Sequence, residues 1–454
     1  MIDNVYICCI KIKRRKFRME NIKNNTADKV SIKPQMLKGT VSVPASKSAL
    51  HRGIIAAALS GGKCTIKNVS MSQDIEATLR GIKAFGCKSV LNSKARTLTL
   101  SPQRTAKSSN NVTEIDCGES GSTLRFLIPI ALVPNMCGDV KRIRFIGHGR
   151  LMQRPLKPYF DMFDSHGISY KKSGDTLELC GTLKSGAYEI EGNVSSQFIT
   201  GLLFALPLLD DDSEITVLNG AESKGYIDMT INTLKQFGIE IENRNYIKYI
   251  IRGNQKYKTQ NFTAEADYSQ AAFFLVAGAI GCDIECLGLS SDSLQGDREI
   301  INIIKKVGGK IVKGKNGGIC AKRTSLMRAT DIDASEIPDL VPILAVLLSF
   351  CKGESRIYNA GRLRMKESDR LAATAGELSH LGVNITEGAD SLTVIGGQTI
   401  NCGTVSSRHD HRIAMALAIA ACRAEGDEVR ITDAYSAVKK SYPDFFDVYR
   451  ELCK

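Results

Sequence analysis

The chain has 454 residues, of which 43% are hydrophobic and 24% are charged, and its formal net charge is +13. These values are typical of a globular protein of two or three domains, and they exclude a disordered, collagen-like or coiled-coil chain. The positive charge indicates an anionic partner, for which a nucleic acid, a membrane surface and a phosphorylated metabolite are the candidate classes.

The first thirty residues differ in composition from the rest. We expect residues 1–30 to be a basic, disordered extension, because the run at 11–18 is typical of a solvated tail. No secretory signal is expected, and the longest apolar run, 340–351, is too short to cross a bilayer. The fourteen cysteines are scattered without zinc-binding spacing. We therefore expect a cytoplasmic protein with reduced thiols and no metal.

One pattern recurs five times along the chain: an amphipathic helix, a terminal glycine and then two alternating strands. The helix-ending glycines are Gly86, Gly167, Gly238, Gly308 and Gly382. Their spacing of roughly 70 to 80 residues exceeds the periods of solenoids, and each glycine suits a left-handed helix C-cap. Residues 445–452 predict the helix of a sixth, truncated copy. We therefore predict an α/β fold built of α+β repeats, divided three and three near residues 260–270.

Five polar clusters along the chain have the residue types of a binding or catalytic site. In the first, residues 41–52, a serine would cap a helix with Lys47 near its first turn and with Ser48 and Arg52 on one face. A helix dipole disfavours a cation there unless an anion binds beside it. A bound anion and an ordinary serine cap with solvated cations are equally consistent with this cluster.

Two further clusters precede apolar helices in the first half of the chain. Residues 116–125 form a Gly/Ser loop in which Gly121 would let a ligand approach the backbone, although a simple turn has the same composition. Ser195, Ser196 and Gln197 begin the next apolar helix, where their polar groups suit a phosphate as well as a helix cap.

The last two clusters lie in the second half. Lys366 and Arg370 are like charges four residues apart, with Glu367 between them. This arrangement is unfavourable in an isolated helix, although neighbouring carboxylates can offset it in a salt-bridged surface helix. Residues 408–412 are all polar and directly precede a buried, Ala-rich helix. Polar residues in such a position are rarely part of a loop without a function.

Three single residues complete the set. Asp339 lies at the edge of a buried stretch, where a raised pKa would suit a general base, although such carboxylates are often N-caps. Arg150 and Lys440, taken alone, are typical of solvated loop cations.

Together and in this order, the clusters resemble those of the 5-enolpyruvylshikimate-3-phosphate (EPSP) synthase family over residues 31–454. The resemblance implies two inverse α/β-barrel-like domains, each of three βαβαββ units, with a cleft between them. Residues 31–45 with 265–454 would form one domain and residues 46–264 the other.

The resemblance also implies the reaction. The enolpyruvyl group of phosphoenolpyruvate is transferred to the 5-hydroxyl of shikimate 3-phosphate, with release of phosphate, on the shikimate pathway to chorismate and aromatic amino acids. We expect a monomer that binds these two small molecules, no nucleic acid and no membrane, and that needs no cofactor. Such anions require several inward-facing cations.

Individual roles follow from the matching motifs. Shikimate 3-phosphate would be bound by Lys47, Ser48, Arg52, Ser195, Ser196, Gln197, Ser223, Asp339, Arg362 and Lys366. Phosphoenolpyruvate would be bound by Lys47, Gly121, Arg150, Arg370, Arg412 and Lys440. The expected catalytic residues are Lys47, Asp339, Lys366 and Glu367. We expect Asp339 to accept the 5-hydroxyl proton and either Glu367 or Lys366 to deliver a proton to C3 of the enol.

Two alternatives remain open from the sequence. The sister enzyme UDP-N-acetylglucosamine enolpyruvyl transferase has the same architecture and donor, but it typically uses a loop cysteine in a Gly-rich setting, and no cysteine here has that context. A basic nucleic-acid-binding protein would account for the charge. Against it, tryptophan is absent, aromatic residues make up only 6% of the chain, and no nucleic-acid-binding motif occurs.

Overall fold

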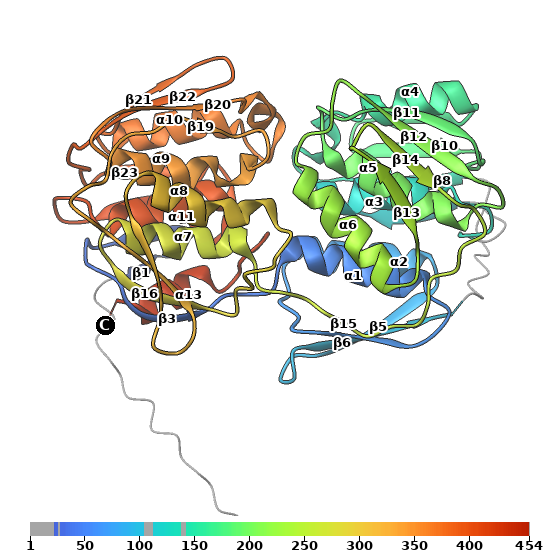
Figure 1. Ribbon diagram of the computed structural model, residues 1–454, viewed down its shortest axis with the longest axis horizontal. Helices are drawn as coiled ribbons and strands as arrows, with labels where there is room; N and C mark the ends of the chain where they lie inside the picture. The colour runs from blue at the N-terminus through green and yellow to red at the C-terminus, as the bar shows by residue number, and fades with distance from the viewer. Residues whose placement is uncertain (1–21, 26–27, 104–111, 138–141, 454) are drawn as a thin grey trace, which may run out of the picture.

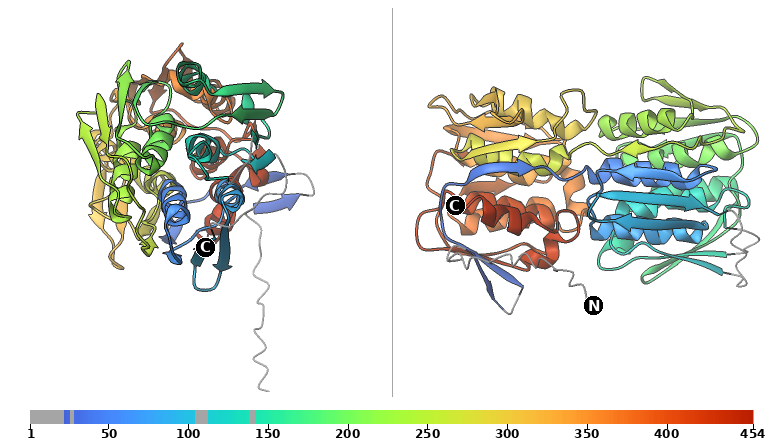
Figure 2. Two further views of the ribbon diagram at one scale, coloured as in Figure 1. Left: turned by 90° about the vertical axis from the view of Figure 1, so that its right-hand side faces the viewer. Right: turned by 90° about the horizontal axis from the view of Figure 1, so that it is seen from below.

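The computed structural model describes residues 22–25, 28–103, 112–137 and 142–453. The chain forms two lobes that lie side by side (Figure 1). Each lobe has its own hydrophobic cluster. That of the first lobe runs from Val30 to Val43 and from Ala266 to Leu452, and that of the second from Ala45 to Ala264. The two connections between the lobes lie together, joined by a bridge between Ala45 and Ala266 (Figure 2).

Within the described ranges, the second lobe contains three four-stranded sheets. In spatial order, their strands are β15 (Phe262–Thr263), β4 (Cys64–Lys67), β6 (Thr97–Pro102) and β5 (Cys87–Asn92); β7 (Val112–Asp116), β8 (Arg142–Ile146), β10 (Thr176–Cys180) and β9 (Ser169–Ser173); and β11 (Ala187–Glu191), β12 (Ser213–Leu218), β14 (Lys248–Ile251) and β13 (Ile241–Arg244). Its helices are α1 (Lys47–Leu59), α2 (Gln73–Ala84), α3 (Gly121–Ala131), α4 (Lys157–His166), α5 (Ser196–Ala205) and α6 (Lys224–Gln236).

The described part of the first lobe contains the other three sheets. In spatial order, their strands are β3 (Lys38–Ser42), β16 (Asp283–Leu287), β18 (Ile319–Lys322) and β17 (Lys310–Lys313); β19 (Ile332–Asp333), β20 (Gly353–Tyr358), β22 (Leu392–Gly396) and β21 (Asn384–Glu387); and β23 (Thr404–Ser406), β24 (Val429–Thr432), β2 (Lys29–Ile32) and β1 (Ile22–Asn25). Its helices are α7 (Tyr268–Ala279), α8 (Ile300–Lys306), α9 (Val341–Ser349), α10 (Arg370–His380), α11 (His411–Ala421), α12 (Ala434–Val438) and α13 (Phe445–Glu451).

All six sheets share one arrangement. Two parallel strands lie beside an antiparallel hairpin, and the later strand of the hairpin pairs antiparallel with one of the two parallel strands, as in β7, β8, β9 and β10. The five predicted helix-ending glycines adopt φ values between 67° and 93°, as a left-handed C-cap requires. Each is followed by the hairpin that the repeat predicts, so the fivefold pattern is confirmed.

The sixth copy lacks its hairpin at the C-terminal end of the sequence, but its sheet is complete in the structure. The predicted helix at its end is α13, which is confirmed. Its hairpin comes from the other end of the chain, because β2 pairs antiparallel with β24 and β1 pairs with β2. A complete four-stranded sheet results, in which the edge of β24 is covered.

This pairing corrects the expected start of the fold. Disorder up to residue 30 is wrong for residues 22–25 and 28–30, because they form β1, a turn and the start of β2, and Val30 is fully buried. The Asp28 carboxylate also accepts hydrogen bonds from the backbone N–H groups of Tyr435 and Ser436 near the start of α12. The rest of the proposed extension, including the basic run at 11–18, lies outside the described residues.

In each lobe, the helix that follows the first strand of each repeat unit is buried. These helices are α1, α3 and α5 in the second lobe and α7, α9 and α11 in the first. They are rich in Ala, Leu and Ile on every face, as expected of helices that other elements surround. None of the helices in the described ranges is long and apolar enough to cross a membrane.

Candidate active site

The N-terminal ends of all six buried helices meet at one cleft between the lobes. The cleft encloses about 1100 Å³, including its open mouth. Its lining includes Lys47 and Ser48 from α1, Gly121 and Ser122 from α3, Ser196 and Gln197 from α5, Ser269 and Gln270 from α7, Asp339 just before α9, and His411 and Arg412 from α11. Free N–H groups and aligned peptide dipoles make each such end favourable for an anion.

Side-chain caps and the lining of the cleft come from the same clusters. Ser46, Ser120, Ser195, Asp267 and Asp410 each accept a backbone N–H bond at the start of a buried helix. The serine caps that the sequence left open are therefore confirmed for Ser46 and Ser195, whereas the Asp339 side chain caps no helix. The neighbouring residues of the same clusters point into the cleft, so capping and ligand binding do not exclude each other here.

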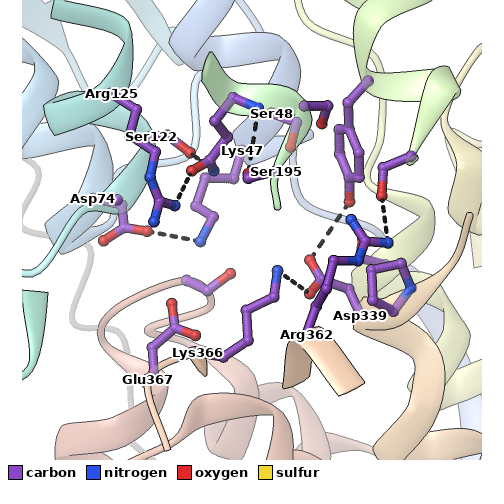
Figure 3. Close-up of a pocket in the computed structure, with 18 of the residues that line it drawn as sticks. Lys47, Ser48, Asp74, Ser122, Arg125, Ser195, Asp339, Arg362, Lys366 and Glu367 are labelled. Carbon is purple, nitrogen blue, oxygen red and sulfur yellow. Dashed lines mark hydrogen bonds and ion pairs between the residues drawn. The ribbon is translucent and has the colours of Figure 1, made fainter. Parts of the chain in front are cut away.

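The second-lobe wall is held by a network around two cations. Lys47 Nζ donates to Asp74 Oδ2 at 2.8 Å (Figure 3). Arg52 is almost fully buried, and its guanidinium donates to Thr230 Oγ1 and to the backbone oxygens of Ser48 and Tyr226, each at 2.8 Å. These bonds fix both side chains before any ligand arrives.

A second network on the same wall surrounds the amide of Gln197. Arg125 Nη1 donates to Gln197 Oε1 at 2.7 Å, and Gln197 Nε2 donates to Ser122 Oγ at 2.9 Å. Ser195 lies beside this chain of bonds (Figure 3). Three polar groups from α3 and α5 are thereby oriented toward one part of the cleft.

The first-lobe wall centres on Asp339. Its Oδ1 accepts from Arg370 Nη1 at 3.0 Å, and its Oδ2 accepts from Arg412 Nη2 at 2.9 Å. Lys366 Nζ lies 3.6 Å from Oδ1 (Figure 3). Arg370 also donates to Glu367 Oε2 and to Asp410 Oδ2, each at 2.7 Å. The buried Arg370 guanidinium thus binds the carboxylates of Asp339, Glu367 and Asp410 at one edge of the cleft.

These contacts set the protonation of the first-lobe residues. Burial alone would raise the pKa of Asp339, but Arg412, Lys366 and Arg370 outweigh burial and lower that pKa well below its usual value. The raised pKa expected from the sequence is therefore wrong. Glu367 follows the same logic, since Arg370, Lys440 and Arg154 lower its pKa well below normal despite burial. Both carboxylates are ionised at neutral pH.

The pKa values of Lys366 and His411 are both lowered, which favours the neutral form of each side chain. Burial lowers the pKa of Lys366 to about 8, although Asp339 raises it. Lys366 therefore titrates closest to neutral pH of the three proton-transfer candidates. Burial, together with the nearby Lys47, lowers the pKa of His411 well below its usual value. The His411 ring is neutral, and neither of its nitrogens has a hydrogen-bond partner among the described residues.

Most of the residues expected at the site line this cleft. They are Lys47, Ser48, Arg52, Gly121, Ser195, Ser196, Gln197, Ser223, Asp339, Arg362, Lys366, Glu367, Arg370 and Arg412. Lys440 lies at the border, with its Nζ 3.8 Å from Glu367 Oε1. It is buried, not the solvated cation that its local sequence suggests.

Arg150 does not line this cleft. It is exposed and faces a neighbouring pocket that Glu119 and Arg408 also line. A short 3-10 turn (Leu151–Gln153) separates it from Arg154, which is buried and lines the cleft. Arg154 Nη1 lies 3.7 Å from Glu367 Oε1. Arg154 therefore lines this cleft, whereas Arg150 lines an adjoining pocket that shares Glu367 with it, and the role predicted for Arg150 stays a prediction.

Sequence reasoning missed several other lining residues. Asp74, Arg125, Tyr226, Asp267, Gln270 and His411 were given no role. Asp267 and Asp74 lie at helix starts, where an aspartate is typical of helix capping. Tyr226 is typical of an aromatic residue in the core. Only Arg125 and His411 stood inside clusters that the sequence singled out. In the part of the chain that the structure describes, no group of three or more His, Cys, Asp or Glu side chains is arranged to bind a metal.

Comparisons with known proteins agree with the cleft. Residues 32–449 match the family model described as EPSP synthase (3-phosphoshikimate 1-carboxyvinyltransferase). The 3-phosphoshikimate 1-carboxyvinyltransferase of Clostridium perfringens is 45% identical over 426 residues, which cover 93% of this chain and 98% of that protein. The one from Clostridium novyi is 46% identical over 443 residues, which cover 96% of this chain and 98% of that protein.

Solved structures share the fold. The EPSP synthase of Acinetobacter baumannii superposes with a TM-score of 0.75 at 23% identity, covering 93% of this chain and 98% of that chain. The enolpyruvyl transferase NikO of Streptomyces tendae superposes with a TM-score of 0.73 at 17% identity, covering 93% and 97%. The resemblance seen in the motifs is confirmed, and this chain belongs to the EPSP synthase family.

Proposed function

We propose that this chain transfers the enolpyruvyl group of phosphoenolpyruvate to the 5-hydroxyl of shikimate 3-phosphate and releases phosphate, as a step of the shikimate pathway. One observation carries the proposal: six helix N-termini and a set of buried cations converge on a single cleft. The two substrates bring two phosphates and two carboxylates, which need that many inward-facing donors. The relative that is 45% identical over 93% of the chain is named for this activity, 3-phosphoshikimate 1-carboxyvinyltransferase.

The two substrates divide the cleft in this proposal. Ser195, Ser196, Gln197, Ser223, Ser48 and Arg52 bind shikimate 3-phosphate at the starts of α5, α6 and α1, and Arg362 binds it from the first lobe. Lys47, Gly121, Arg154, Arg370, Arg412 and Lys440 bind phosphoenolpyruvate. Lys47 and Lys366 lie between the two groups, where Figure 3 shows them reaching in from opposite lobes. Charge-assisted hydrogen bonds to planar guanidinium groups orient the enol carboxylate and its phosphate.

Proton transfer is assigned from the protonation states. The 5-hydroxyl oxygen attacks C2 of phosphoenolpyruvate while Asp339, already ionised, accepts the hydroxyl proton. Lys366 delivers a proton to C3 in the same step and receives one back when phosphate leaves, since its pKa of about 8 allows both directions. Glu367 is ionised through Arg370, so we assign it the orientation of Arg370 and Lys440.

We further infer that the two lobes are two domains built as inverse α/β barrels. The support is that the hydrophobic clusters separate between Val43 and Ala45 and between Ala264 and Ala266. The first domain then includes the hairpin of β1 and β2. Movement of one domain against the other lets substrates enter and then excludes water. A cytoplasmic, monomeric enzyme without a cofactor completes the proposal.

The test is phosphate release from phosphoenolpyruvate with two acceptors offered separately. Shikimate 3-phosphate is expected to support release and UDP-N-acetylglucosamine is not. The carboxyvinyl ether is then identified by mass spectrometry of the product. Release with the sugar nucleotide alone would assign the other acceptor, and release with neither would refute the proposed activity.

A further inference from the structure

Among the described residues, two ion pairs at the rim of the cleft join a carboxylate of the second lobe to a cation of the first. Glu119, in the loop before α3, lies with its Oε2 3.0 Å from Lys440 Nζ. Glu222, just before α6, lies with its Oε2 2.5 Å from Arg362 Nε. In both pairs the second lobe supplies the carboxylate and the first lobe supplies the cation. Both cations are among the groups that the proposed function assigns to substrate.

The two partners of each pair differ in burial. The side chains of Lys440 and Arg362 are only 7% and 14% exposed, whereas those of Glu119 and Glu222 are 52% and 32% exposed. When its ion pair breaks, a carboxylate at the rim can rotate into the solvent at little cost in free energy. A buried cation cannot do so, and it needs another anion in place of the lost carboxylate.

Each cation is placed where a substrate anion would compete with the carboxylate. Lys440 Nζ lies 3.8 Å from Glu367 Oε1, at the end of the cleft assigned to phosphoenolpyruvate. Arg362 Nη2 donates to Ser223 Oγ at 3.3 Å, at the end assigned to shikimate 3-phosphate (Figure 3). The two carboxylates therefore act on different substrates.

Glu119 is held in its place by the loop that follows β8. His148 N donates to Gly118 O at 2.7 Å, which ties this loop to the residue before Glu119. Gly149 adopts φ +55°, and a Cβ at that position would lie only 2.6 Å from Glu119 Oε1. The absence of a side chain at Gly149 leaves the space that the Glu119 carboxylate occupies. The pair with Lys440 is thus built by the local backbone.

We propose that the Glu119 and Glu222 carboxylates compete with the substrate anions for Lys440 and Arg362, so that the substrates must displace them when they bind. This inference rests on the proposed function. Glu119 weakens the binding of phosphoenolpyruvate, because its phosphate or carboxylate exchanges with Glu119 on Lys440. Glu222 weakens the binding of shikimate 3-phosphate in the same way on Arg362. Neither carboxylate touches the reacting atoms, so the chemical step is unaffected.

The test compares E119Q and E222Q with the wild type in steady-state phosphate release. We expect E119Q to lower the KM for phosphoenolpyruvate roughly two- to fivefold and to leave the KM for shikimate 3-phosphate and kcat unchanged, as suits a partly exposed ion pair. E222Q lowers only the KM for shikimate 3-phosphate, by a similar factor. Each variant serves as the control for the other.

A matched control for the change in net charge is E242Q. Glu242 pairs with Arg244 at 2.8 Å within the exposed β13–β14 hairpin, outside the cleft. It should leave both KM values unchanged. Calorimetric titration with shikimate 3-phosphate alone gives a second readout, in which E222Q binds more tightly than wild type and E119Q binds equally. The alanine variants E119A and E222A should shift the same constants in the same direction.

Unchanged or raised KM values in active E119Q and E222Q would overturn the inference, because the carboxylates would then be neutral or would support the substrate-binding cations. Equal shifts of both constants in either variant, or a shift in E242Q, would also overturn it, since a general charge effect would explain them. The proposed function fails separately: wild-type protein that releases no phosphate with these two substrates refutes that function, whatever the variants do.

Discussion

Exchanging Arg150 and Arg154 for glutamine tests which of two nearby arginines binds substrate. Arg154 is 9% exposed, lines the cleft and lies 3.7 Å from the Glu367 carboxylate, whereas Arg150 is exposed on a neighbouring pocket. R154Q should therefore lose a charge-assisted hydrogen bond to the phosphoenolpyruvate anion, and R150Q should lose only a solvated charge.

The burial of each arginine sets the expected size of its effect. A hydrogen bond between charged groups contributes about 1.5 to 3 kcal/mol, which corresponds to a roughly 10- to 200-fold loss of kcat/KM for R154Q. An exposed charge contributes at most about 1 kcal/mol, so R150Q should lose no more than about fivefold. Glu367 keeps its bond to Arg370 at 2.7 Å in R154Q, so the variant is expected to fold.

The assay is steady-state phosphate release with phosphoenolpyruvate varied at saturating shikimate 3-phosphate. Thermal unfolding of both variants checks that the comparison concerns folded protein. Equal losses, or a larger loss in R150Q, would refute the placement of Arg154 in the site and the reasoning from burial.

Three further outcomes are expected. Asp339→Asn should lower kcat by about 100- to 10,000-fold in the phosphate-release assay, since general-base catalysis has that range, and activity within tenfold of wild type would contradict the base assignment. The pH profile of kcat/KM should fall as pH rises through about 8, because Lys366 is protonated below that value and neutral above it; K366Q should lack this limb, and a fall that persists in K366Q would assign it to another group. Asp28→Ala should lower the free energy of unfolding by about 0.5 to 2 kcal/mol in a denaturant titration, because its carboxylate accepts from Tyr435 N and Ser436 N at a helix start, and an unchanged midpoint would argue against this cap.

Local features of the fold could be predicted because their causes lie within a few residues. Gly86 and the four other helix-ending glycines adopt positive φ, since a left-handed C-cap depends on the immediate backbone. The apolar helices and the polar residues before them follow from periodicity and capping for the same reason. The hairpin at residues 22–32 could not be predicted, because its partner strand β24 lies about 400 residues further along the chain.

The composition of the site was partly predictable and its electrostatics were not. Family motifs identified Asp339 and Lys366, yet the sequence predicted a raised pKa for Asp339, whereas Arg370 and Arg412 lower it. Arg150 and Arg154 could not be distinguished, because the turn between them decides which one is buried.

The sequence by itself determined the repeated units, the helix starts with their polar clusters and the family of enzymes. The tertiary structure decided which charges meet: Glu119 with Lys440, 321 residues apart, and Arg370 with Asp410, 40 residues apart. Helix caps and turns depend on neighbouring backbone, which the sequence displays directly. Pairing, burial and pKa depend on distances in space and on exclusion of water, which arise only when all six units are assembled.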